Sequence, residues 1–248
     1  MTNATVSYDA ARVGVRDDLR AAHSRFWESL ARPGNWWSGA ERIAIAAASR
    51  RATTCTLCRE RKAAVSAGAV QGEHDSDGVL AECAVDVVHR VTTDPGRLSQ
   101  NWFDAVRAGG LSEEQYVEII GIVVALISVD AFCRGMGVPL HALPEPQSGE
   151  PDHYRPAAAQ AGTGWVAMIP NGRALGAEKG LFGPGGRTAN VIRAMSLVPD
   201  AVRTLLDLSK AHYLSPEEMT DLRRGRTLDR AQIELIAGRV SALRECFY

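Results

Sequence analysis

The stretch LSEEQYVEIIGIVVALISVDAFCRGMGV, residues 111–138, decides the fold class of this chain. Ser112 with Gln115 three positions later matches a capping box, which marks the start of a helix. Gly135 and Gly137 close the stretch, and glycine is the common residue just past the end of a helix. The pattern therefore predicts one long helix.

Helical patterns continue on both sides of that helix. Apolar residues at helical spacing predict further helices over residues 10–31, 40–52, 55–67, 79–91, 98–108, 190–196, 199–212 and 228–240. No segment shows a convincing alternation of apolar and polar residues, as a half-buried strand would. The expected fold class is all-α.

The composition changes in the middle of the chain. Residues 138–156 contain five prolines, and residues 157–187 are rich in glycine and irregular in pattern. We therefore expect an N-terminal helical module over residues 1–138, an irregular connector over 139–188 and a C-terminal helical module over 189–248.

Composition and charge exclude several classes of protein. Hydrophobic residues make up 46% of the 248 positions and the formal net charge is −1, so neither bulk disorder nor broad attraction to nucleic acid or anionic membrane is indicated. Residues 1–18 lack a leader pattern, and the longest apolar run, 119–129, is interrupted by Gly121 and Ser128. The odd count of five cysteines argues against a fully paired disulfide framework. A cytoplasmic protein with free thiols is expected.

Two segments of the chain look alike. The sequence AERIAIA over residues 40–46 precedes Cys55, and AQIELIA over residues 231–237 precedes Cys246. Ile45 and Ile236 both lie ten residues before their cysteine. A duplicated helical module accounts for this, and so does the shared alanine-rich composition of two helices.

The pair Cys55 and Cys58 is the first motif that carries chemistry. In a reducing compartment, Cys-x-x-Cys indicates a redox dithiol or half of a metal site. If Thr53 or Thr54 caps the following helix, Cys55 lies in its first turn, where the helix dipole stabilises a thiolate. Basic residues nearby have the same effect: Arg59, Arg61 and Lys62.

Zinc would need two more ligands beside these cysteines. Cys83, His74 and His89 are available, but the chain has no second Cys-x-x-Cys and no His-x3-His. We expect the two histidines on a loop and on a helix surface, and we predict neither a metal nor a cofactor. A third possibility is that both thiols of the pair pack as small apolar groups.

Glu234 and Cys246 form the second motif. Twelve residues of straight helix would separate them by about 18 Å, so they can meet only if the chain turns back. We place that break within residues 241–245. Taken alone, Glu234 reads as a solvated carboxylate on a helix face.

The final stretch, RAQIELIAGRVSALRECFY over residues 230–248, resembles the AhpD-like alkylhydroperoxidase and carboxymuconolactone decarboxylase superfamily. The redox motif of that family is Glu, eleven residues, Cys-x-x-Cys, three residues and His. Glu234 and Cys246 fit its first two positions, while its second cysteine would be residue 249. Residues 111–138 and 190–199 resemble the peroxidase-related branch, and the resemblance covers most of the chain beyond about residue 36 at superfamily level.

The resemblance implies an AhpD-like helical bundle, a homo-oligomer and a thiol- or selenol-dependent peroxidase that is reduced by a dithiol or a reductase protein. Glu234 would relay protons, and Cys246 would resolve the oxidised residue at position 249. Some members carry selenocysteine there, encoded by a codon that also means stop. We therefore expect selenocysteine at 249, with a natural end at Tyr248 as the alternative.

The first module departs from the family pattern. Lys62 stands where the relay histidine would follow Cys58, and Ile43 stands where Glu234 has its counterpart. Cys55 and Cys58 are thus a dithiol without the family's relay, and they remain the only intact pair. The alternative functions are a decarboxylase-like enzyme without a redox pair and a non-catalytic helical interaction protein.

Overall fold

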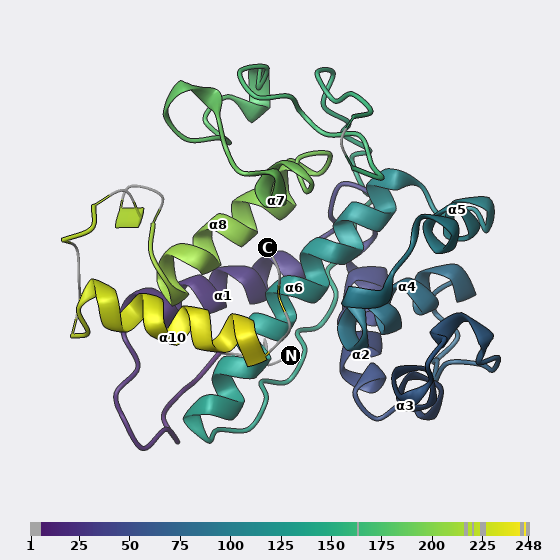
Figure 1. Cartoon of the computed structure of the whole chain (residues 1–248), viewed down its shortest axis with the longest axis horizontal. Helices are drawn as coiled ribbons and strands as arrows, with labels where there is room; N and C mark the ends of the chain where they lie inside the picture. The colour runs from purple at the N-terminus through teal and green to yellow at the C-terminus, as the bar shows by residue number, and fades with distance from the viewer. Residues whose placement is uncertain are drawn as a thin grey trace. The chain divides into compact units, whose positions relative to one another are not determined.

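The computed structural model of the whole chain describes residues 6–162, 164–215, 218–219, 221–223, 227–243 and 246, with the side chain of residue 184 left aside. Within these ranges the chain is helical and no strand forms (Figure 1). A single antiparallel bridge joins Gln160 and Met168. The predicted all-α class is confirmed.

The helices, in chain order, are α1 Asp17–Ala31, α2 Gly39–Ala52, α3 Thr56–Ala63, α4 Glu82–Thr93, α5 Gln100–Ala108, α6 Glu113–Met136, α7 Asn190–Arg193, α8 Pro199–His212 and α10 Arg230–Leu243. Short 3-10 turns occur at Ala67–Ala69, Pro95–Arg97, Gly176–Glu178 and Pro184–Gly186. The start of α1 was predicted seven residues too early, at residue 10, and those of α4, α5 and α10 two or three residues too early. α5, for example, begins after Ser99, because the Ser99 hydroxyl caps the N–H of Trp102.

α6 is the long helix that the sequence predicts. The Ser112–Gln115 capping box forms in both directions, with Gln115 N–H donating to the serine hydroxyl at 3.0 Å. The helix runs through Gly135 and ends at Gly137, which adopts the left-handed conformation at φ 68°. The end therefore lies at the second of the two predicted glycines, because only that position requires a positive φ.

α6 is buried on most of its circumference. Among the described residues it is the one helix long and apolar enough to cross a membrane by length and composition, and 61% of its apolar window is buried inside the protein. α2 and α4 pack against it and against each other (Figure 1). Small buried residues on α2, Ala44 and Ala48, allow the helices to approach closely, and α4 and α6 contribute larger buried residues such as Val88 and Leu126.

Two buried ion pairs fix α2 against α6. Arg50 binds both oxygens of Asp130, at 2.9 and 2.8 Å, in a bidentate pair. Arg42 pairs with Glu118, which also accepts the backbone N–H of Trp36 at 2.7 Å. Burial raises the pKa of Glu118, although the Arg42 guanidinium opposes this. These pairs set how α2 and the residues that follow it are oriented.

The contacts divide the chain into two compact units, Met1–Leu208 and Ser209–Tyr248. The first unit contains α1 to α7 and the beginning of α8, and the second contains α10. The three-part division at residues 138 and 188, and the duplication of a helical module, stay predictions.

Candidate functional site: two thiols and two imidazoles

Cys55 and Cys58 lie where α2 gives way to α3. Cys55 is the N-cap residue of α3, with no side-chain capping hydrogen bond, and its N–H donates back to the Arg51 and Ala52 carbonyls. The prediction that Thr53 or Thr54 caps this helix is wrong. Their hydroxyls instead donate to the last carbonyls of α2, so the threonines close one helix and leave Cys55 to begin the next.

Both thiols of the pair are reduced and buried. Cys55 is 0% exposed and Cys58 is 4% exposed. They form a small apolar cluster with Leu57, against which the partly buried Val70 packs. Of the other thiols, Cys133 is buried, Cys83 is partly exposed and Cys246 is exposed.

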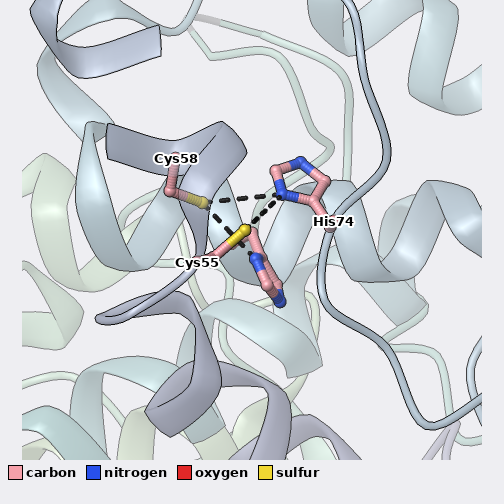
Figure 2. A group of neighbouring side chains, drawn as sticks. Cys55, Cys58 and His74 are labelled. Carbon is pink, nitrogen blue, oxygen red and sulfur yellow. Dashed lines mark hydrogen bonds between the residues drawn. The ribbon is translucent and has the colours of Figure 1, made fainter. Parts of the chain in front are cut away.

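His74 comes from the irregular segment between α3 and α4. The His74 side chain is only 7% exposed, whereas all the remaining residues between positions 71 and 79 are exposed. Its Nδ1 lies 3.6 Å from Cys55 Sγ and 3.5 Å from Cys58 Sγ, so both sulfurs face one ring nitrogen (Figure 2). An imidazole thus reaches the dithiol from a loop, and not from the position of Lys62.

Asp86 on α4 holds the other nitrogen of that ring. Its Oδ1 lies 3.0 Å from His74 Nε2 and also accepts from Arg61 and Arg90, at 2.9 and 3.1 Å. Its Oδ2 accepts from the Trp102 indole at 2.6 Å. Four groups therefore fix this carboxylate, and the carboxylate orients the imidazole towards the sulfurs.

His89, one α4 turn beyond Val85, completes the cluster. It is 0% exposed, so its expected place on a helix surface is wrong. The spacing from Val85 puts it on the buried face of the helix. Its Nδ1 lies 3.4 Å from Cys58 Sγ, and the ligand atoms of all four side chains lie within 4.8 Å of one another.

The residues of the cluster shift one another's pKa values. Burial alone would lower the pKa of His74, but the Asp86 carboxylate and the two thiols outweigh it and raise that pKa to about 10. Burial would raise the pKa of Cys55, but backbone N–H groups of Asp75 and Cys58 and the His74 ring lower it. Burial and the neighbouring His74 charge lower the pKa of His89 to about 4.

A small cavity reaches the cluster from the side of α4. It is lined by Cys58 and His74 together with residues such as Arg61, Arg90 and Thr93, and its volume is about 10 Å³. That is the space of about one water molecule. Cys58 is therefore the thiol that a small molecule in this cavity would meet.

The structure describes only part of the second predicted motif, which pairs Glu234 with Cys246. α10 ends at Leu243, inside the segment where we expected a break, while residues 244 and 245 lie outside the described ranges. The Cys246 N–H donates to the Ser241 carbonyl at 3.0 Å. Glu234 is exposed and accepts from Arg230 Nε at 2.6 Å. A meeting of Glu234 and Cys246 stays a prediction.

Comparisons with known proteins add no relative. No protein-family model matches the chain, and neither curated proteins nor solved structures yield a match.

Proposed function

We propose that the protein is a thiol-dependent oxidoreductase that reduces peroxides with Cys55 and Cys58. One observation carries this proposal: the two thiols of a Cys-x-x-Cys share a single imidazole nitrogen, and a carboxylate holds the other nitrogen of that ring. A nucleophile, a base and a group that orients the base are the parts that thiol chemistry needs. Here they come from Cys58, His74 and Asp86.

The first step uses Cys58, because Cys58 lines the cavity. Its thiolate attacks the terminal oxygen of a peroxide ROOH, an S–O bond forms, the O–O bond breaks, and His74 gives its proton to the departing alkoxide. The product is ROH and a sulfenic acid on Cys58. His74 lies at hydrogen-bonding distance from this sulfur, and it is the histidine of the cluster whose pKa is raised, so it carries the proton.

In the second step Cys55 resolves the sulfenic acid. Its sulfur attacks Cys58 Sγ, the S–S bond forms, the S–O bond breaks, and hydroxide leaves with the Cys55 proton as water. An external dithiol then reduces the disulfide by two exchange steps and is itself oxidised. The sum is ROOH plus a dithiol giving ROH, water and a disulfide.

Burial limits the substrate. Both thiols are less than 5% exposed, and the cavity beside Cys58 has room for about one water molecule. We expect hydrogen peroxide to react and bulky lipid or aryl hydroperoxides to be poor substrates. A small dithiol, or a reductase protein that displaces the exposed loop around His74, would be the reductant.

The resemblance to AhpD-like alkylhydroperoxidases favours the same chemistry and remains a proposal, as do its bundle architecture and the homo-oligomer. Under this resemblance, Cys246 and Glu234 would form a second redox centre. The exposed thiol of Cys246 is accessible to a partner residue or reductant, which distinguishes it from the buried pair.

Hydrogen peroxide consumption with dithiothreitol tests the proposal. We expect Cys58→Ser and Cys55→Ser to lose at least about 100-fold of the rate, because each removes one of two obligatory sulfurs. Cys83→Ser, which changes a thiol outside the cluster, is the matched control and should keep the rate. Equal rates of peroxide consumption in wild type, Cys55→Ser and Cys58→Ser would refute the proposal.

A further inference from the structure

We infer that the reduced form of this site binds one Zn²⁺ ion, with Cys55 Sγ, Cys58 Sγ, His74 Nδ1 and His89 Nδ1 as a tetrahedral ligand set. The inference does not depend on peroxide reduction, because it needs only four donors that converge on one point. It also revises the expectation from sequence that no metal is bound. That expectation rested on missing ligand spacings, whereas the missing ligands are supplied by a loop and a neighbouring helix.

Three of the distances between the donors fit a zinc tetrahedron. Zn–S bonds of about 2.3 Å and Zn–N bonds of about 2.0–2.1 Å, at tetrahedral angles, place each sulfur about 3.6 Å from each nitrogen. The observed sulfur–nitrogen distances are 3.6, 3.5 and 3.4 Å. Thiol–imidazole hydrogen bonds have similar lengths, so the convergence of all four donor atoms within 4.8 Å of one another is the observation that favours an ion.

Few buried apolar side chains order the segment between α3 and α4. Most of its residues are exposed, and the apolar cluster of Cys55, Leu57 and Cys58 has three buried members, of which two are the cysteines themselves. Polar contacts also hold the segment, such as Arg51 with Asp77 and Arg61 Nε with the Val70 carbonyl. His74 is the one residue between positions 71 and 79 that turns inward, and it turns to the two sulfurs.

The groups around the donors also fit a metal. Asp86 accepts from His74 Nε2, which leaves Nδ1 free to bind, and such a carboxylate behind a ligand histidine is usual at zinc sites. Two thiolates balance the charge of a divalent ion, and a set of two sulfurs and two imidazoles is typical of Zn²⁺. Both histidines use the same ring atom, Nδ1.

Zinc binding and thiol oxidation are mutually exclusive states of the pair. A disulfide between Cys55 and Cys58 offers no thiolate, so two-electron oxidation by a peroxide removes two of the four donors and releases the ion. The bound ion, in turn, keeps both sulfurs from attacking. Zinc would hold the reduced protein in a stable resting form.

Direct metal binding tests the inference. Full-length protein, reduced and dialysed, is titrated with Zn²⁺ and with Co²⁺, and metal content is measured by elemental analysis. We expect one ion per chain, and for Co²⁺ the intense visible bands of tetrahedral coordination with a thiolate-to-metal band in the near ultraviolet. No binding at one equivalent, or the weak spectrum of octahedral Co²⁺, would overturn it. This wild-type measurement needs no variant to fold.

Variants separate this inference from the proposed function. His89→Leu should reduce the metal content from one ion per chain to nearly none, because it removes one of the four donors. His153→Gln, at an exposed histidine, is the matched control and should bind fully. Full metal binding by His89→Leu contradicts the ligand set. Wild-type protein that binds one Zn²⁺ but consumes no peroxide once the ion is removed would instead contradict the proposed function.

Discussion

Asp86→Asn is expected to weaken both the fold and the site. The carboxylate accepts four donors, three at Oδ1 and the Trp102 indole at Oδ2. An asparagine amide must point its NH2 at one of these two sets of donors, and it leaves Arg61 and Arg90 without their shared counter-charge. Losing charge-assisted hydrogen bonds at a mostly buried position should lower the free energy of unfolding by about 2–4 kcal/mol.

Asp86→Asn should also lower the zinc affinity and the peroxide-consumption rate of the site. Removing a carboxylate that orients a ligand or relay histidine usually costs about 10- to 100-fold in metal affinity or activity. We therefore expect the dissociation constant for Zn²⁺, from competition with a chromophoric chelator, to rise by that factor. The rate of peroxide consumption should fall similarly, because His74 is no longer held towards the sulfurs.

Asp130→Asn is the matched control for that experiment. It also breaks a buried pair with an arginine, Arg50, but Asp130 contacts none of the four ligand side chains. Urea unfolding should show comparable destabilisation in both variants, and only Asp86→Asn should change zinc affinity. The reasoning is refuted if the zinc dissociation constant of Asp86→Asn stays within about twofold of wild type, or if Asp130→Asn weakens zinc binding equally.

Three further predictions concern the fold around α6. Burial raises the pKa of Tyr116 to about 12 from its ordinary 10, so the free energy of unfolding that this residue supports below pH 10 is lost as pH rises towards 12. Tyr116→Phe should reduce this alkaline loss of unfolding free energy by about 3 kcal/mol. An unchanged alkaline slope in urea unfolding would contradict this. Gly121→Ala places a Cβ 2.7 Å from Ala201 Cβ, and overpacking should outweigh the gain in helix propensity, lowering the free energy of unfolding by about 1 kcal/mol. Gly137→Ala, at φ 68°, should destabilise by about 1 kcal/mol, whereas Gly135→Ala in the exposed last turn should stabilise by up to about 1 kcal/mol; the same sign for both would refute the conformational argument.

Local patterns predicted the helices, because their determinants lie within a few residues. The Ser112–Gln115 box and Gly137 are read directly from the sequence, and they begin and end α6 where expected. The Cys-x-x-Cys pair was also found in this way. The exact role of Cys55 was not, because the competition between two threonines and a cysteine for the helix junction depends on which carbonyls are free in α2.

The histidines of the site were beyond local patterns. The direction of His74 is set by a loop conformation that no periodicity encodes. His89 was available in principle, since its spacing from Val85 places it on the apolar face of α4, where a histidine needs a partner. Its partner is a sulfur on another helix, which spacing along the chain does not reveal.

All four donors of the cluster lie in one continuous stretch, residues 55–89, and this stretch precedes α6 in the chain. During synthesis these residues leave the ribosome before the helix on which α2 and α4 will pack has been made. Contacts that are close in sequence form without waiting for distant partners. The thiols and imidazoles can therefore meet while the chain is still growing, before α6 has been made.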